Sequence, residues 1–181
     1  DKGYEHFTGC LVMPIIDHNG LVTEVYGRKI RSDLTKSAPR HLYLSGPHKG
    51  IWNPDSLKSA GTLISPTMPK EKMIILTEAL IDALTFWVHG FRNVTSSYGT
   101  AGFTPDHLKA FLEYGIQRVY IAYDRDDAGD LAANKLAQKL SGEGIQCYRV
   151  KFPKDMDVNA YAQQSKEPEK ALLQIILAAE F

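Results

Sequence analysis

The chain has 181 residues, of which 44% are hydrophobic and 23% are charged, as is typical of a globular protein with room for one domain or two small lobes. No apolar run approaches the roughly eighteen residues that span a membrane, and no basic-then-apolar leader opens the chain, so we expect a cytoplasmic protein without a membrane partner. The formal net charge is zero, which argues against attraction of nucleic acid by the whole surface. Because the chain opens at Asp1 rather than at methionine, we expect a fragment of a longer protein.

The cysteines and histidines do not suggest a zinc site. Cys10 and Cys147 are far apart in the sequence and form no CxxC pair, and the six histidines show neither HExxH nor HxH spacing. We therefore expect both cysteines to be reduced thiols on or near strands.

Residues 1–69 are predicted to form a small lobe that is rich in β-strand. An apolar run at 10–16 ends in the sequence Asp-His-Asn-Gly, which is a hairpin turn signal, and 21–30 is predicted to be the returning strand. A further short strand is expected at 41–44. A linker rich in proline at 65–70 then separates this lobe from the rest of the chain.

Residues 70–181 are predicted to form a second domain in which strands and helices alternate. The expected strands are 72–76, 93–96, 118–123 and 145–151, and the expected helices are 79–89, 105–114, 128–140 and 168–179. In the helix at 128–140 we expect the apolar side to consist of Ala128, Leu131, Ala132, Ala137 and Leu140. Short, fully apolar strands that alternate with helices predict an α/β fold whose parallel sheet is covered on both faces.

Acidic or small residues follow each predicted strand of this second domain. They are, in chain order, Glu78, Gly99, Thr100, Asp124, Asp126, Asp155 and Asp157. The carboxyl ends of parallel strands meet at one edge of a sheet, where such folds bind their ligands. Clustered carboxylates repel one another unless a divalent cation lies between them, and oxygen ligands favour Mg²⁺, Mn²⁺ or Ca²⁺ over zinc. Taken singly, each acid could instead be a helix N-terminal residue or a solvated loop residue.

Four segments that carry these residues resemble the Toprim domain of bacterial DnaG-type primases. They lie at 77–82, 98–100, 123–129 and 152–157, and include a Glu at the end of the first strand and an Asp-x-Asp at the end of a later one. The resemblance implies a Toprim-type parallel sheet flanked by helices, with a smaller β-rich N-terminal lobe. It also implies that Glu78, Asp124 and Asp126 are catalytic and bind Mg²⁺ (or Mn²⁺), and that Asp82 and Asp157 are further metal ligands.

The function implied by this resemblance is that of a DNA primase. Such an enzyme transfers nucleotides from NTPs onto a growing RNA primer along a single-stranded DNA template, and a replicative helicase is an expected partner. Two other functions remain open from the sequence. One is a different Toprim enzyme, either a topoisomerase-like protein or a nuclease, and the other is a catalytically silent module that binds metal and nucleotide.

A basic stretch in the first lobe is the candidate nucleic-acid surface. Residues 26–58 contain seven Lys and Arg residues against two Asp, although the chain as a whole is neutral. Sequences around Tyr26-Gly27-Arg28 and His48-Lys49-Gly50 are similar to the primase segment that precedes the Toprim domain, so Arg28, Lys49 and Arg40 are expected to contact phosphates. The alternative is a solvated basic loop.

Three positions depart from the primase pattern. Ala79 stands where glycine usually follows the metal-binding Glu, and Arg125 replaces a common glycine within the Asp-x-Asp motif. Asn159 stands where a further Asp is common. These changes indicate a divergent primase, of the kind that a mobile genetic element carries.

Overall fold

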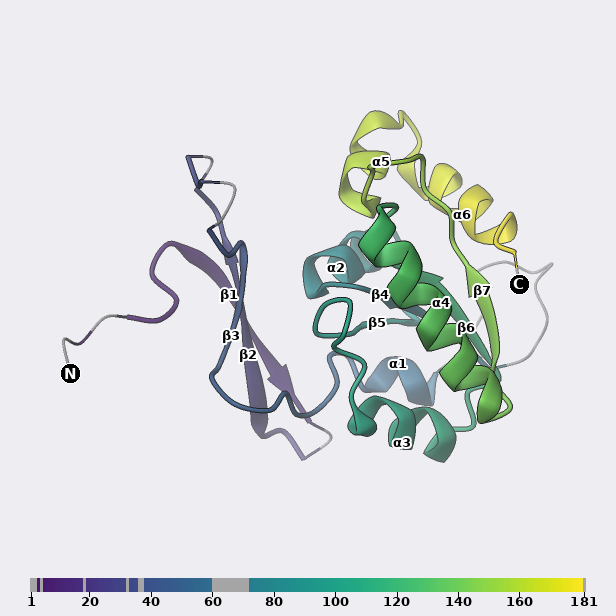
Figure 1. Ribbon diagram of the computed structural model, residues 1–181, viewed down its shortest axis with the longest axis horizontal. Helices are drawn as coiled ribbons and strands as arrows, with labels where there is room; N and C mark the ends of the chain where they lie inside the picture. Colours follow the sequence, from purple (N-terminus) through teal and green to yellow (C-terminus); the bar gives the residue numbers. More distant parts are fainter. Residues whose placement is uncertain are drawn as a thin grey trace.

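The computed structural model describes residues 3, 5–17, 19–31, 33–35, 38–59 and 72–180. These residues form two separate sheets, one antiparallel near the N-terminus and one parallel and surrounded by helices (Figure 1). The predicted linker at 65–70, and with it the predicted domain boundary at 69–70, lies outside the described residues.

The antiparallel sheet has three strands in the order β1-β2-β3, which are Cys10–Ile16, Val22–Lys29 and His41–Tyr43. The turn between β1 and β2 is stabilised by the Asp17 carboxylate, which accepts hydrogen bonds from the backbone N–H groups of Asn19 at 2.8 Å and Leu21 at 3.0 Å. Gly20 adopts a φ of 79°, which suits a residue without a side chain. The Asp-x-Asn-Gly turn signal therefore correctly predicted this hairpin.

The parallel sheet has four strands in the order β5-β4-β6-β7. In chain order they are β4 (Met73–Thr77), β5 (Val94–Ser96), β6 (Arg118–Ala122) and β7 (Gln146–Arg149). The helices are α1 (Asp55–Lys58), α2 (Leu80–Val88), α3 (Pro105–Glu113), α4 (Asp127–Gly142), α5 (Val158–Gln164) and α6 (Pro168–Leu177). In the described part of the chain, no helix is long and apolar enough to cross a membrane.

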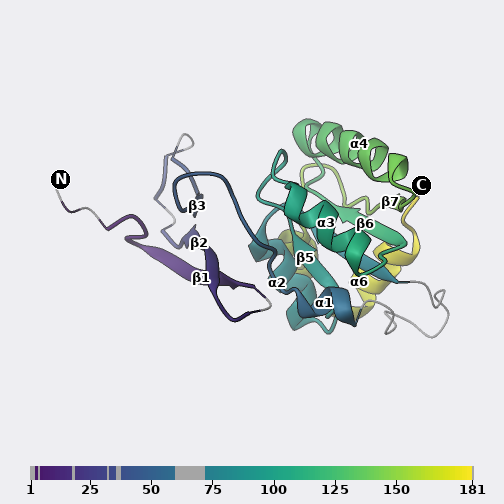
Figure 2. The ribbon, with the colours of Figure 1, turned by 90° about the horizontal axis from the view of Figure 1, so that it is seen from below.

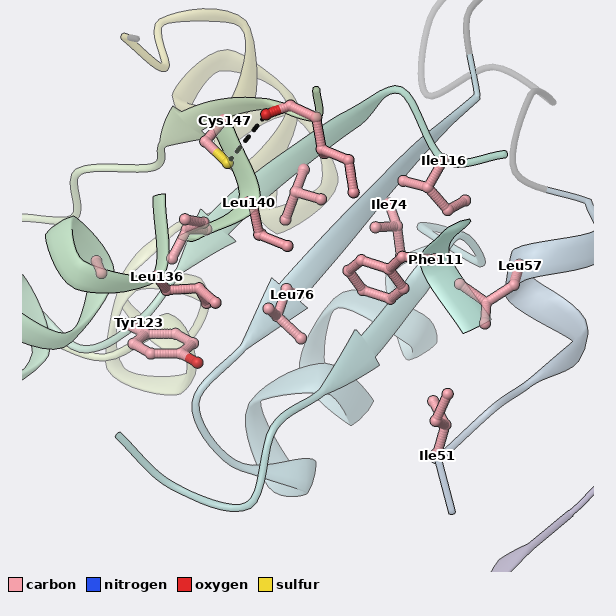
Figure 3. Packing of buried hydrophobic residues seen from close by; sticks show 14 residues of the cluster. Ile51, Leu57, Ile74, Leu76, Phe111, Ile116, Tyr123, Leu136, Leu140 and Cys147 are labelled. Atoms are coloured by element: carbon pink, nitrogen blue, oxygen red, sulfur yellow. Dashed lines mark hydrogen bonds between the residues drawn. The ribbon is translucent and has the colours of Figure 1, made fainter. Parts of the chain in front are cut away.

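Both faces of the parallel sheet are covered, as predicted. Alternate residues of β4 point to opposite faces. Ile74 and Leu76 pack under α3 and α4 (Figure 3), whereas Met73 and Ile75 pack against α2, α5 and α6. Figure 2 shows α4 on one side of the sheet and α6 on the other. Because helices cover both faces, the ends of the strands are where a ligand can reach the sheet itself.

The structure corrects two helical expectations. The buried side of α4 consists of Gly129, Ala133, Leu136 and Leu140, whereas Leu131 is 56% exposed. The predicted stripe was therefore displaced around the helix. The short helices α1 and α5 were not predicted, because four and seven residues hold too few apolar positions for a helical period to emerge.

Residues before the linker pack with the parallel sheet as well as with the first lobe. Ile51 and Leu57 join the core that contains Ile74 and Phe111 (Figure 3). The antiparallel sheet itself meets the second domain through a smaller cluster, whose buried members are Ile15, Tyr26, Leu80 and Tyr98. The N-terminal residues therefore make apolar contacts with the second domain in two places, one through Ile51 and Leu57 and one through Ile15 and Tyr26.

Candidate active site

A pocket of about 390 Å³ lies where the carboxyl end of the parallel sheet faces the antiparallel sheet. The side formed by the second domain carries four acidic residues, which are Glu78, Asp82, Asp124 and Asp157. The side formed by the first lobe carries Arg28, Arg40 and His41. The structure thus brings together six of the eight residues that the sequence singled out for this site.

Backbone pairing places Glu78 at the edge of the sheet. Thr77 is paired with Ala122, so the residues that follow β4 and β6 emerge at the same level. The Glu78 carbonyl accepts a hydrogen bond of 2.9 Å from the backbone N–H of Gly99, which has a φ of 92°. The loop after β5 therefore fixes the residue after β4, and a glycine permits the turn.

The Asp-x-Asp motif divides into two roles. Asp124 lines the pocket, whereas Asp126 caps α4 by accepting a hydrogen bond of 2.7 Å from Gly129 N–H, and it is not among the pocket-lining residues. A Cβ atom on Gly129 would lie 2.3 Å from the Asp124 carbonyl oxygen, so the helix can approach the strand end only with glycine at this position. Arg125, the residue between the two acids, pairs with Asp130.

Asn159, which stands where primases commonly have an Asp, makes defined contacts. The Asn159 side-chain amide donates a hydrogen bond of 2.7 Å to the Asp82 carboxylate, and its oxygen accepts from the Thr85 hydroxyl. Asp157 caps α5 by accepting a hydrogen bond of 2.7 Å from Ala160 N–H. Asn159 thus connects α5 to α2 without adding a further negative charge to the pocket.

The carboxylates raise the pKa values of one another. Burial, followed by the charges of Asp124 and Asp126, raises the pKa of Glu78 to about 7. Burial and the charge of Asp157 raise the pKa of Asp124 to about 6, and burial, with Asp124 and Asp157, raises the pKa of Asp82 well above its ordinary value. Such a cluster is stabilised by any cation that enters it.

The residues present fit a divalent cation that retains water. All the candidate ligands are carboxylate oxygens, and Oε2 of Glu78 is buried and has no hydrogen-bond partner among the residues that the structure describes. Among the described residues, no group of three acidic, histidine or cysteine side chains is arranged to enclose an ion. Such an open arrangement suits a cation that is bound by one or two carboxylates and keeps several waters.

Lys49 lies apart from this pocket. It lines a different cavity beside Asp17 and Asp106, and its backbone carbonyl accepts a 2.8 Å hydrogen bond from the Tyr98 hydroxyl. Of the three predicted phosphate-binding residues, only Arg28 and Arg40 therefore share the pocket with the acids.

Arg149 of β7, which was not predicted from the sequence, stabilises the backbone at the end of β6, next to the acidic residues. Its side chain is 13% exposed, and the guanidinium donates to the carbonyls of Tyr123 at 2.8 Å and Asp124 at 2.9 Å and pairs with Asp130 at 2.8 Å. No clear signal in the sequence marked this arginine, because the predicted strand at 145–151 also contains the polar residues Gln146 and Lys151.

Comparison with known proteins agrees with this architecture. Residues 75–162 match the family model described as Toprim-like, and this range contains all five predicted acids. This part of the chain resembles a Toprim domain. The matched region begins within β4, ends within α5 and contains β5, β6 and β7 in full.

Similar proteins extend the similarity to the N-terminal lobe. A DNA primase of Helicobacter pylori strain J99 is 29% identical over 157 residues, which are 87% of this chain and 27% of that protein. The structure of the zinc-binding and RNA polymerase domains of Aquifex aeolicus primase aligns with a TM-score of 0.75 at 25% identity, over 99% of this chain and 43% of that chain.

A DnaG primase catalytic domain bound to single-stranded DNA shares the fold, with a TM-score of 0.71 at 19% identity over 94% of this chain and 52% of that chain. The chain spans roughly a quarter of the length of the curated relatives that it matches. The Toprim-type fold and the relationship to DnaG-type primases, both expected from the sequence, are therefore confirmed.

Proposed function

We propose that this chain is the metal-binding part of a DNA primase, which transfers nucleotides from NTPs to an RNA primer on a single-stranded DNA template. The observation that carries the proposal is one pocket in which acids from a Toprim sheet face two arginines from a neighbouring sheet. Toprim primases depend on a metal ion, and we propose Mg²⁺, with Mn²⁺ as a substitute, because every candidate ligand is a carboxylate oxygen.

In this proposal Glu78 and Asp124 hold the cation, and Asp126 contributes its charge and the cap of α4. Asp82 and Asp157, on the same side of the pocket, orient the site. A divalent cation held there would favour loss of the proton of an attacking hydroxyl and would offset the charge of the leaving pyrophosphate. Arg28 and Arg40 bind phosphate oxygens across the pocket, where a guanidinium can donate two hydrogen bonds to one phosphate.

The proposed template is single-stranded DNA, as in the DnaG catalytic domain that shares this fold. Lys49, on the same lobe as Arg28 but outside the pocket, is proposed to contact the template backbone farther from the reacting atoms. We further propose that the protein works in the cytoplasm, where bacterial replication takes place. A replicative helicase stays an expected partner of the whole protein, on the resemblance alone.

Two other functions would leave different products in one assay. The protein is incubated with single-stranded DNA, labelled NTPs and Mg²⁺, and products are separated by length. A primase makes short RNA that disappears when either the template or the metal is omitted. A topoisomerase-like protein or nuclease instead changes the DNA, and a silent module changes neither; either result would contradict the proposal.

A further inference from the structure

Arg28 is held by a histidine on the neighbouring strand. Arg28 of β2 is paired with His41 of β3, and the Nη1 atom of Arg28 lies 2.5 Å from Nε2 of the His41 ring. The other ring nitrogen, Nδ1, lies 2.9 Å from the hydroxyl oxygen of Tyr26. Tyr26 is fully buried between the lobes, so the imidazole has a fixed support behind it.

These two contacts determine the state of the imidazole. A guanidinium can only donate hydrogen bonds, so Nε2 of His41 must be the acceptor. A neutral ring then carries its proton on Nδ1, which donates to the Tyr26 hydroxyl oxygen. Although His41 as a residue is exposed, partial withdrawal of its ring from solvent, with Arg28 and Arg40 nearby, lowers its pKa to about 4. The ring is therefore neutral at the pH of a cell.

The contact leaves most of the guanidinium available. Among the described residues, no carboxylate forms an ion pair with Arg28, although the acids of the Toprim edge line the same pocket. One Nη1 hydrogen is used by His41, and the remaining N–H groups can meet an anion. An anion that occupies this pocket lies between a cation on one side and a metal held by carboxylates on the other, which suits a nucleoside triphosphate.

We infer that His41 is a positioning residue that holds the Arg28 guanidinium in the orientation in which it binds the phosphates of the incoming nucleotide. The inference rests on the proposed function and adds a residue to it. A flexible arginine loses side-chain entropy when it binds a phosphate, and a neutral acceptor that already restrains the guanidinium reduces that loss. A protonated or apolar residue at position 41 could not supply this acceptor.

The test measures binding of ATP in the presence of Mg²⁺ by calorimetry, so it does not depend on primer synthesis. Arg28→Ala should weaken ATP binding about tenfold or more, since it removes a charge-assisted hydrogen bond. His41→Phe keeps a ring beside Tyr26 but removes the acceptor, and should weaken binding roughly three- to tenfold. His41→Gln returns an oxygen near the position of Nε2 and should restore most of the affinity.

A double-mutant cycle separates positioning from a structural role. If His41 acts through Arg28, the double variant Arg28→Ala/His41→Phe should bind ATP no more weakly than Arg28→Ala alone. Thermal unfolding of every variant checks that the fold is intact, and His41→Gln keeps the test valid if His41→Phe does not fold. Additive losses in the cycle, unchanged affinity in His41→Phe, or wild-type protein that does not bind ATP would each overturn the inference.

A second measurement examines the imidazole directly. Nitrogen-15 chemical shifts of His41 should show a neutral ring with the proton on Nδ1 at pH 7, and Arg28→Ala should shift the Nε2 resonance. A ring that is protonated at pH 7 would contradict the inference, whereas failure to synthesise primers alongside normal ATP binding and normal shifts would count only against the proposed polymerase activity.

Discussion

The acidic and the basic walls of the pocket are built by different means. Glu78 directly follows β4 and Asp124 is the second residue after the neighbouring strand β6, so the register of these two parallel strands governs their separation. Arg28 instead depends on a side-chain contact with His41, which belongs to a strand of only three residues. The difference teaches that topology alone can place a metal-binding edge, whereas a phosphate-binding side chain also needs a specific partner.

The largest expected effect comes from removing one charge at the acidic wall. Asp124→Asn should lower primer synthesis by roughly 100-fold or more, an effect of the size seen when one preorganised electrostatic contact is removed. It should also weaken Mg²⁺ binding measured by calorimetry. Asp127→Asn is the matched control, because Asp127 is exposed and lies outside the pocket. Equal losses of primer synthesis in both variants would show that Asp124 has no special role at the end of the sheet.

The next effect concerns stability of the same wall. Arg149→Met should lower the free energy of unfolding by about 2–3 kcal/mol, because it leaves Asp130 with one fewer partner and removes donors from the Tyr123 and Asp124 carbonyls. Urea unfolding measures the loss. Lys151→Met is a control, because Lys151 forms an exposed ion pair with Glu180 and such pairs contribute little. A stability loss no greater than that of the control would mean that the contacts of Arg149 do not stabilise the end of β6.

A smaller effect is expected when cations of the first lobe are removed. Arg28→Ala and Lys49→Ala should each weaken binding of single-stranded DNA several-fold and flatten its dependence on salt by about one phosphate contact. Because Lys49 lines a different cavity, the two losses should add in the double variant. Salt titrations with an oligothymidylate measure both slopes. If the salt dependence of binding equals that of the wild type, the basic stretch is a solvated loop that does not contact the DNA.

The smallest effect is a pH dependence of stability without divalent metal. Since the pKa of Glu78 rises from 4.5 to about 7 on folding, the native state binds more protons than the unfolded state between these pH values. The free energy of unfolding should therefore fall as pH rises from about 4.5 to 7. The carboxyl is only partly buried, so solvent screening reduces the change to about 1 kcal/mol.

Two comparisons sharpen that measurement. Glu78→Gln removes the titrating group and should flatten the fall, and added Mg²⁺ should oppose it by binding the native state. Stability that rises through the same pH range would show that the acids of this edge do not repel one another.

The sequence predicted the secondary structure best where a hydrophobic pattern was bounded by residues that start or end a helix or strand. Fully apolar strands predicted β4 and β6, and Thr104-Pro105 predicted the start of α3, where the Thr104 side chain takes part in a capping box and Pro105 is the first helical residue. The acids at the ends of β4 and β6 followed from that frame.

Other features depend on contacts between residues distant in sequence. Asn159 and Asp82 meet across 77 positions, and Arg149 reaches the carbonyls of β6 from β7. No local pattern encodes such pairs. The division of the Asp-x-Asp motif was also hidden, because an acid before a helix can be a ligand or an N-cap and the sequence is the same in both cases.

The segment before α1 closes the open edge of the parallel sheet. The Asn53 side-chain amide donates hydrogen bonds to the outward-facing carbonyl of Val94 at 2.9 Å and to that of Arg92 at 3.2 Å, and the Trp52 carbonyl accepts one of 2.6 Å from the Thr95 hydroxyl. An uncovered edge strand invites pairing with other molecules and aggregation. Anyone who expresses the Toprim-like part alone should therefore begin the fragment upstream of residue 51, since a fragment that begins at β4 would leave β5 exposed.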